Sequence, residues 1–455
     1  MSHSASITFH GGAGTVTGAN FLLDTGEQKI LVDCGLMQGA EFCEDANYAP
    51  FAYKPEEISF LVVTHAHTDH IGRIPLLVKR GFKGKIISTH PTKDIAALMY
   101  EDALGIMKEE AREKHRDPLY EKEDVAAALS LWETFEYYKQ QDMGDDVTLK
   151  FLNAGHILGS AMAEFTRSGK KLVFTGDLGN QPAPVVKEND KLSDTSFLVM
   201  ESVYGDRNHE EVENRHALLK EAIEDTRKKN GTLLIPAFSL QRTQSLLLEI
   251  NALVEDGEIE PIDVYLDTPL GVKVLGVYQK YPEYFNERVS ERVEEGDDPF
   301  DFTGLKLTVR SEESRAIEHS PNPKIIIAGS GMSHGGRIRM HEIQFLGEKS
   351  TTLLFVGYQS VGSLGRRLSE GQKRVRIDKQ WVTVRAEVQS ISGFSAHKDR
   401  DQLMEFVEPA SLTLQKVFVA MGEPKSSLFL TQRLRDFFGV DATAPESGSV
   451  HTIDW

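Results

Sequence analysis

The amino-acid sequence predicts an α/β protein with two domains. Its 455 residues exceed what one ordinary hydrophobic core organises, so two domains are expected. Short apolar runs typical of buried strands recur along the chain, and most of them end in polar or glycine-rich turns. In the second half, helical patterns follow these turns, which is typical of a parallel sheet whose functional loops lie beyond the strand ends.

Composition limits the classes of protein that fit. Apolar residues make up 40% of the chain and charged residues 26%, and no stretch approaches the roughly 20 apolar residues of a membrane span. The first residues lack the basic and apolar regions of a signal peptide. Two cysteines, Cys34 and Cys43, are too few for a disulfide framework. We therefore expect a cytoplasmic protein with no membrane partner.

Net charge restricts nucleic-acid binding to local surfaces. The chain has 51 basic and 69 acidic residues, and this formal charge of −18 argues against a general nucleic-acid coat. Residues 366–385 nevertheless carry seven Lys or Arg against only Glu370 and Asp378. This run is compatible with a basic channel, and a solvated face is the alternative.

The first 205 residues contain most of the predicted strands. Apolar and alternating patterns predict strands at residues 6–9, 20–24, 29–33, 60–63, 84–89, 147–152, 171–175 and 196–200. Apolar residues at helical spacing predict two long helices, at residues 92–115 and 122–140.

The densest group of potential metal ligands follows the strand at residues 60–63. Within the run Thr64-His65-Ala66-His67-Thr68-Asp69-His70, three imidazoles and a carboxylate fall within six positions. Imidazole nitrogen and carboxylate oxygen are the ligands expected of Zn²⁺ or a similar divalent ion. A solvated, histidine-rich turn is the alternative, but this density of ligands at a strand end favours a metal site.

Four further polar side chains follow predicted strands: Asp33, His156, Asp177 and Glu201. Each alone would be weak evidence, and a lone Asp33 is more often a turn residue. If the strand ends converge on one edge, these side chains and the histidine cluster supply ligands for two metal ions. Asp33 could then be a carboxylate that orients a ligand histidine.

From about residue 205 the pattern becomes that of a parallel α/β unit. Strands are predicted at residues 231–237, 262–266, 324–328 and 351–356, and helices at 208–229 and 243–254. The tail returns to the style of the first part, with strands at 382–391 and 415–420 and helices at 399–407 and 428–438.

These motifs together resemble the metallo-β-lactamase superfamily, and more narrowly its β-CASP branch of nucleic-acid nucleases. Residues 64–70 resemble the superfamily signature H-x-H-x-D-H, which lactamases and thioesterases share. The β-CASP resemblance rests on Met200-Glu201-Ser202-Val203-Tyr204-Gly205-Asp206, Gly331-Met332-Ser333-His334-Gly335-Gly336-Arg337 and Ser392-Gly393-Phe394-Ser395-Ala396-His397. The resemblance covers nearly the whole chain, and it points to bacterial and archaeal RNA-processing enzymes that are similar to the endonuclease subunit of the cleavage and polyadenylation factor.

The resemblance implies a fold and a domain order. An αββα sandwich, the metallo-β-lactamase domain, would comprise residues 1–205 and 381–455. An inserted α/β domain with a parallel sheet, the β-CASP domain, would comprise residues 206–380.

The resemblance also implies a role for each site residue. His65, His67 and His156 would hold one zinc ion, with Asp177 bridging to a second ion held by Asp69 and His70. The catalytic residues would be Asp69, Asp177, Glu201 and His397, with His397 as general acid or phosphate ligand. Substrate contacts are expected from Ser333, His334, Arg337, Gln359 and Arg366.

Met421 departs from the family pattern, which has a histidine before Gly-Glu at this position. A thioether is soft and neutral and is a poor ligand for Zn²⁺. We therefore expect Met421 to pack rather than to coordinate, and the second zinc site to be weak.

Three functions are compatible with these features. The first is a zinc-dependent ribonuclease acting on single-stranded RNA that enters between the domains, as an endonuclease, a 5′ exonuclease or both. The second is a catalytically weakened RNA-binding protein, which Met421 would explain. The third is a small-molecule metallohydrolase acting on a lactam or a thioester. The long insertion and the retained ligands favour the ribonuclease.

Overall fold

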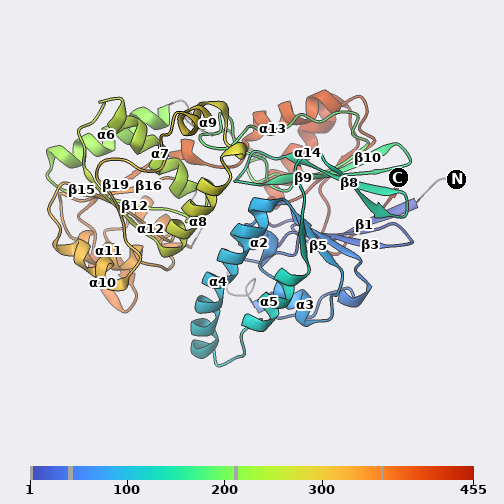
Figure 1. The fold of residues 1–455 in the computed structure, drawn as a ribbon, viewed down its shortest axis with the longest axis horizontal. Coiled ribbons are helices and arrows are strands. Elements are labelled where there is room, and N and C mark those ends of the chain that lie inside the picture. Colours follow the sequence, from blue (N-terminus) through green and yellow to red (C-terminus); the bar gives the residue numbers. More distant parts are fainter. Residues whose placement is uncertain (1–3, 39–44, 210–213, 358, 360–361) are drawn as a thin grey trace. The chain divides into compact units, whose positions relative to one another are not determined.

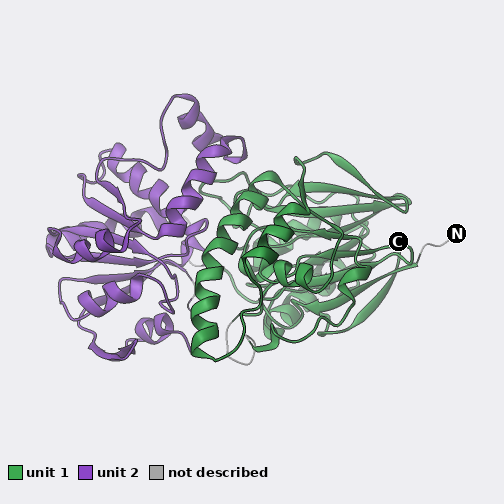
Figure 2. Cartoon of the chain, turned by 60° about the horizontal axis from the view of Figure 1, so that its bottom comes forward, with its two compact units in different colours: residues 1–208, 397–455 green, residues 209–396 purple. Residues whose placement is uncertain are grey.

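The structure is a computed structural model that describes residues 4–38, 45–209, 214–357, 359 and 362–455. The chain divides into two compact units, of which unit 1 comprises residues 1–208 and 397–455 and unit 2 comprises residues 209–396 (Figures 1 and 2). Strand β19 (Glu387–Ser390) belongs to unit 2, because it pairs in parallel with β16 (Thr352–Phe355) of that unit.

Unit 1 contains two seven-stranded sheets. The first has the order β22-β1-β2-β3-β4-β5-β6. Its strands are β22 (Val450–Asp454), β1 (Ser4–Gly11), β2 (Asn20–Asp24), β3 (Lys29–Val32), β4 (Phe60–Val62), β5 (Lys85–Ser88) and β6 (Trp132–Thr134). The second has the order β21-β20-β11-β10-β9-β8-β7. Its strands are β21 (Ala442–Thr443), β20 (Lys416–Val419), β11 (Phe197–Met200), β10 (Lys170–Phe174), β9 (Ala161–Arg167), β8 (Val147–Asn153) and β7 (Gln140–Gly144).

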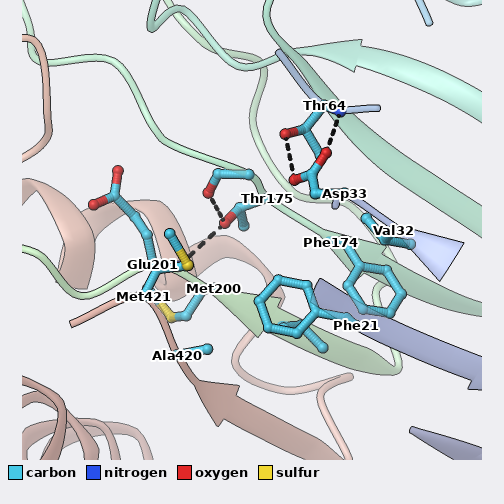
Figure 3. Close-up of a pocket in the computed structure, with 12 residues that line it drawn as sticks. Phe21, Val32, Asp33, Thr64, Phe174, Thr175, Met200, Glu201, Ala420 and Met421 are labelled. Carbon is cyan, nitrogen blue, oxygen red and sulfur yellow. Dashed lines mark hydrogen bonds between the residues drawn. The ribbon is translucent and has the colours of Figure 1, made fainter. Parts of the chain in front are cut away.

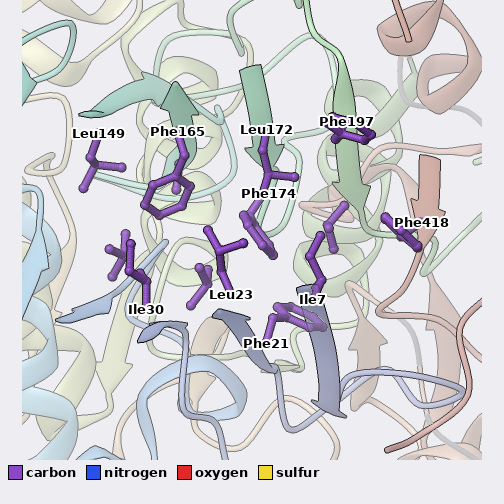
Figure 4. Close-up of a cluster of buried hydrophobic side chains, with 14 of the residues drawn as sticks. Ile7, Phe21, Leu23, Ile30, Leu149, Phe165, Leu172, Phe174, Phe197 and Phe418 are labelled. Atoms are coloured by element: carbon purple, nitrogen blue, oxygen red, sulfur yellow. The ribbon is translucent and has the colours of Figure 1, made fainter. Parts of the chain in front are cut away.

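The core of unit 1 lies between these sheets. Strand β1 alternates buried and partly exposed residues, which is the pattern of a strand with one face in a core. Ile7 and Leu23 of the first sheet and Leu149, Phe165 and Phe174 of the second belong to one buried apolar cluster (Figure 4). The two sheets therefore pack face to face as a sandwich.

Helices cover the outer faces of the sandwich. Figure 1 shows α2 (Thr68–Ile71), α3 (Ile74–Lys79), α4 (His90–Glu113) and α5 (Lys122–Ser130) beside the first sheet. Helices α13 (Arg400–Val407) and α14 (Pro424–Phe438) bury apolar residues in a second cluster with strands of the second sheet. The predicted αββα sandwich is confirmed.

Unit 2 is built on a six-stranded sheet in which every pair is parallel, in the order β14-β13-β15-β12-β16-β19. The strands not yet named are β12 (Thr232–Pro236), β13 (Asp263–Asp267), β14 (Leu305–Leu307) and β15 (Lys324–Ala328). The helices are α6 (Arg215–Lys228), α7 (Arg242–Glu255), α8 (Pro269–Lys280), α9 (Glu287–Glu294), α10 (Ser311–Ala316), α11 (Ile338–Phe345) and α12 (Leu364–Ser369). Strands β12, β15 and β16 are buried throughout, as expected of a parallel sheet covered on both faces.

Two predicted elements are wrong in type or extent. The helix predicted at residues 122–140 ends at Ser130, because Trp132 continues into β6 and pairs with Ile86 of β5. The strand predicted at residues 382–391 is two strands: β18 (Gln380–Thr383) forms a hairpin with β17 (Arg374–Ile377), whereas β19 joins the parallel sheet.

The helix predicted at residues 208–229 and Cys43 lie partly or wholly outside the described residues. The helix predicted from residue 208 begins at Arg215 as α6, and residues 210–213 lie outside the described residues, as does Cys43. No helix in the described part of the chain is long and apolar enough to cross a membrane.

Candidate metal centre

The potential metal ligands of unit 1 lie on loops that leave strands of both sheets. His65 and His67 follow β4, and His156 lies in the turn between β8 and β9. Asp177 follows β10, which only β9 separates from β8 in the second sheet. Strand ends from distant parts of the sequence thus bring these side chains to one place.

Four ligand atoms of these residues surround a common point. Nδ1 of His67 lies 3.1 Å from Nε2 of His65 and 3.2 Å from Nε2 of His156. Oδ2 of Asp177 lies 3.4 Å from Nε2 of His65 and 3.5 Å from Nε2 of His156. Four ligands at ~2.0–2.1 Å from a tetrahedral zinc ion are about 3.3 Å apart. The spacing of this group therefore fits a four-coordinate divalent metal.

The shifted pKa values of His67, His156 and Asp177 favour the forms that bind a metal ion. Burial lowers the pKa of His67 and of His156 well below the usual value, so both imidazoles are neutral. Burial raises the pKa of Asp177, but the charges of His70 and His65 outweigh it and hold that pKa well below its usual value. Neutral imidazoles and an ionised carboxylate are what a divalent ion binds.

Asp33 holds His70 from behind the site. Its Oδ2 lies 2.7 Å from Nδ1 of His70, and both oxygens accept hydrogen bonds of 2.8 Å from the backbone N–H and the hydroxyl of Thr64. Asp33 has a φ of 57°, a region that Asp adopts more readily than most residues. The contact leaves Nε2 of His70 to face the site, as is usual for a histidine metal ligand.

The pKa of His70 is shifted in the opposite direction to the pKa values of His67 and His156. Burial lowers the pKa of His70, but the carboxylates of Asp177 and Asp33 outweigh this and raise it well above the usual value. Nε2 of His70 lies 3.3 Å from Oδ1 of Asp177, yet neither atom has a hydrogen-bond partner of good geometry among the described residues. Such orphaned buried atoms are what a bound cation between His70 and Asp177 would satisfy.

Asp69 is placed less closely. Its Oδ2 lies 4.0 Å from Nε2 of His70. Among the described residues, the groups whose ligand atoms all lie within 4.8 Å are His65, His67, His156 and Asp177, and a second group of Asp177, Glu201 and His397. Asp69 belongs to neither group.

Glu201 and His397 form a pair beside the histidine cluster. Oε1 of Glu201 accepts a 2.6 Å hydrogen bond from the backbone N–H of Leu178 and lies 3.3 Å from Nδ1 of His397. Burial lowers the pKa of His397, but the charge of Glu201 outweighs it and raises the pKa to about 9. The rings of His397 and His156 are 4.6 Å apart. A charged imidazole therefore lies directly beside the candidate metal position.

The loops that follow β8 and β10 pack backbone against backbone at two glycines. A Cβ atom at Gly179 would lie 1.8 Å from the carbonyl oxygen of Gly155, so only glycine allows the loops after β8 and β10 to touch. Gly179 also forms an isolated antiparallel bridge with His397. The position of His397 is thus set by backbone pairing to the loop that carries Asp177.

Met421 lies in the core rather than among the ligands. It is 3% exposed and belongs to the apolar cluster between the sheets. A Cβ atom at Gly12 would lie 2.5 Å from its Sδ, so the thioether packs closely over that glycine. Met421 also lines a cavity with residues of both sheets, at which Asp33 and Thr64 are joined by their two hydrogen bonds (Figure 3).

In unit 2, the carboxyl ends of the parallel strands carry a second polar network, centred on Asp267. Its Oδ1 accepts a 2.7 Å hydrogen bond from Arg337, and its Oδ2 lies 2.7 Å from Nε2 of His341 and 2.6 Å from the hydroxyl of Ser314. Burial raises the pKa of Asp267, but these hydrogen bonds outweigh it and lower the pKa to about 2. Arg337 also donates to the carbonyls of Thr308 and Val309.

The other predicted substrate residues lie on neighbouring loops of unit 2. The hydroxyl of Ser333 bonds to Glu342, and burial raises the pKa of that carboxyl to about 8. The side-chain amide of Gln359 donates to the carbonyls of Gly331 and Gly357. His334 is exposed, and Nε of the partly exposed Arg366 donates a 2.6 Å hydrogen bond to Glu370. Ser333, Arg337 and Gln359 thus brace the loops, whereas His334 and Arg366 reach solvent.

Family models match three parts of the chain. The model of the metallo-β-lactamase superfamily matches residues 13–225, that of the β-CASP domain residues 243–368, and that of a Zn-dependent metallo-hydrolase RNA specificity domain residues 381–445. A ribonuclease of Thermus thermophilus, named TTHA0252, is 35% identical over 93% of this chain and 94% of its own length. The chain belongs to the β-CASP branch of the metallo-β-lactamase superfamily.

Other relatives of this β-CASP protein span the same domains. The transcription termination factor FttA of Methanosarcina mazei is 32% identical over 93% of this chain and 68% of its own length. An RNase J-like protein of Methanocaldococcus jannaschii is 29% identical over 98% of this chain and 99% of its own length. A solved structure of a protein of unknown function from Enterococcus faecalis has a TM-score of 0.57 at 11% identity and covers 99% of this chain and 100% of its own, which shows the fold alone.

Sequence reasoning missed several residues that build this β-CASP protein's polar sites. Thr64 donates two hydrogen bonds to Asp33. The hydroxyl of Ser160 accepts a 3.0 Å hydrogen bond from the backbone N–H of His156. A hydroxyl residue directly before the histidine run was the available signal for Thr64. Asp267 ends a predicted strand in the same way as Asp177 does, so its position was the available signal for the network in unit 2.

Replacement of Asp267 tests the network of unit 2. Because the folded-state pKa lies below the unfolded value of 3.8, the carboxylate contributes stability above about pH 4 and loses it as the pH falls toward 2. Asp267→Asn should lower the free energy of unfolding in urea by about 2 kcal/mol or more at pH 7, and the difference from wild type should shrink below pH 4.

Asp263→Asn provides the matched control on the same strand, because Asp263 pairs with the exposed Lys306 and should cost less than about 1 kcal/mol. Equal losses at the two positions would contradict the role assigned to Asp267.

Proposed function

We propose that this protein is a zinc-dependent ribonuclease that hydrolyses phosphodiester bonds of single-stranded RNA, as an endonuclease, a 5′ exonuclease or both. The observation that carries the proposal is the tetrahedral spacing of His65, His67, His156 and Asp177 with the Glu201–His397 pair beside it. The names of the relatives, which include a ribonuclease and an RNase J-like protein, support RNA as the substrate.

In this proposal the ligand set divides between two metal positions. His65, His67 and His156 would hold the first ion together with Asp177, and Asp69 and His70 would hold the second, with Asp177 shared between the two positions. The second position is the weaker, because Met421 packs in the core and adds no ligand. When bound, divalent ions of this kind supply positive charge at the phosphate and lower the pKa of water to about 7.

The residues of the chain then handle the substrate and its proton. His397 in its charged form donates a proton to the departing 3′ oxygen or binds the scissile phosphate, and Glu201 holds its ring through Nδ1. Asp69 and Asp177 act with them as the catalytic carboxylates. Asp33 keeps His70 oriented, so the geometry survives substrate binding.

Substrate binding is proposed for the loops at the carboxyl ends of the strands of unit 2. The exposed His334 and the partly exposed Arg366 supply side chains for flanking phosphates. Ser333, Arg337 and Gln359 hold the loops that present backbone N–H groups. Contacts of this kind suit a polynucleotide better than a lactam or a thioester.

Cleavage of labelled RNA tests the proposal. Purified protein with Zn²⁺ or Mn²⁺ should shorten single-stranded RNA, and 5′- and 3′-labelled substrates should separate internal from 5′-terminal cleavage. Asp177→Ala should lose at least about 1,000-fold in rate, because Asp177 touches both metal positions and its loss uncouples residues that act as a unit. RNA left uncut by the wild type, or cut equally by both proteins, would refute the ribonuclease.

Substitution of Met421 tests the weak second position. Met421→His should restore a ligand and raise the affinity for a second metal by about 10- to 100-fold, measured as metal bound per chain at increasing free Zn²⁺. Met421→Leu is the control, because it keeps an apolar side chain of similar volume without a ligand atom. If both variants bind metal as the wild type does, position 421 has no part in the second site.

A further inference from the structure

A short antiparallel hairpin of unit 2, formed by β17 and β18, has two different faces. Arg376 pairs with Trp381, and Val375 pairs with Val382. Because pairs alternate across a hairpin, Arg376 and Trp381 share one face and the two valines share the other. Val375 and Val382 are buried in the apolar cluster of unit 2, whereas Arg376 and Trp381 are exposed.

The exposed face carries an unusual tryptophan. The chain has three tryptophans, of which Trp132 and Trp455 are buried and Trp381 is 61% exposed. The guanidinium of Arg374 lies over its ring, 4.9 Å from the centroid. This cation–π contact orients the indole, since Arg374 and Trp381 are diagonal neighbours on the same face.

Positive charge surrounds this indole. Lys373, Arg374, Arg376, Lys379 and Arg385 lie on or next to the hairpin and are exposed. The nearby Asp378 is paired with Arg339, and within the part of the chain that the structure describes none of the five cations forms a salt bridge. Five unneutralised cations in a chain of net charge −18 mark a local surface that is complementary to a polyanion.

We propose that the exposed face of the β17–β18 hairpin, defined by Arg374, Arg376, Trp381 and Thr383, binds single-stranded nucleic acid outside the catalytic site. A base stacks on Trp381, while Arg376 and the flanking lysines contact the adjacent phosphates. Every base has a flat face, so this exposed face of the hairpin, called the platform below, accepts any sequence. A single strand fits better than a duplex because only an unpaired base is free to stack on a protein ring.

This platform rests on the proposed ribonuclease activity only for its biological use, since it would hold RNA that the metal centre cuts. Its binding is measurable without cleavage. The full-length Asp177→Ala protein is therefore the background for the test, so that the RNA stays intact whatever the wild type does.

Tryptophan emission reports directly on the platform. Because Trp132 and Trp455 are buried, quenching on addition of an unstructured RNA of about 16 nucleotides should come from Trp381. Trp381→Phe should abolish the quenching and keep most of the affinity measured by fluorescence anisotropy of labelled RNA. Trp381→Ala should weaken binding by about 5- to 150-fold, the range of one lost base stack.

Charge removal gives a second readout. Arg376→Ala with Lys379→Ala should weaken binding and reduce the slope of log Kd against log salt by about 1.4, since each phosphate contact contributes ~0.7 for a single strand. Lys108→Ala with Arg112→Ala on the exposed face of α4 removes the same charge from unit 1 and is the matched control. It should leave both affinity and slope nearly unchanged.

Several results would overturn the platform. These are an emission unchanged by single-stranded RNA, equal quenching by duplex RNA, and equal effects of the hairpin and α4 variants. An emission that shifts with protein concentration in the absence of RNA would show instead that a second copy of the chain covers the hairpin. Quenching by RNA together with a wild type that never cuts would refute the ribonuclease and leave the platform standing.

Discussion

The metal centre of unit 1 depends on holding three buried imidazoles with their nitrogens facing one another. Nδ1 of His67 lies 3.1 Å from Nε2 of His65 and 3.2 Å from Nε2 of His156, so the three ring nitrogens converge on one point. Burial keeps the pKa of His67 and of His156 low, so both rings stay unprotonated and their nitrogens stay available to a metal ion. The fold thus stabilises a geometry whose natural complement is a cation.

The sandwich provides that geometry through its strand ends. The core between the two sheets fixes the strands, and the loops after β4, β8, β10 and β11 carry the polar residues to one edge. Contacts behind the ligands complete the arrangement: Asp33 orients His70, and Gly179 lets two loops touch. These contacts position the side chains before any metal binds, which favours tight binding.

Much of the fold could be predicted from the sequence, because buried strands have a strong local pattern. The αββα sandwich was expected only from the resemblance of the motifs to the metallo-β-lactamase superfamily, whereas the parallel sheet of the inserted unit follows from apolar runs that end in polar residues. The same logic brought together His65, His67, His156 and Asp177 before any coordinates, and their roles as ligands stay predictions. Local patterns failed at residues 122–140, where long-range pairing of β6 with β5 ended a helix early.

Side-chain contacts were harder to predict than elements. Arg337 was predicted to bind substrate, and the structure shows that its guanidinium also lies 2.7 Å from Asp267, a residue seventy positions earlier in the sequence that the parallel sheet brings close. Such a partner is set by the order of strands, which sequence spacing does not reveal. Trp381 carried no motif, and its exposure follows only from which face of the hairpin packs against the core.

The zinc K-edge X-ray absorption spectrum of the protein loaded with one equivalent of zinc tests the central claim most directly. The account predicts a four-coordinate ion with three imidazoles and an oxygen ligand at about 2.0–2.1 Å and no sulfur. A sulfur ligand at about 2.3 Å, or fewer than three imidazoles, would contradict it.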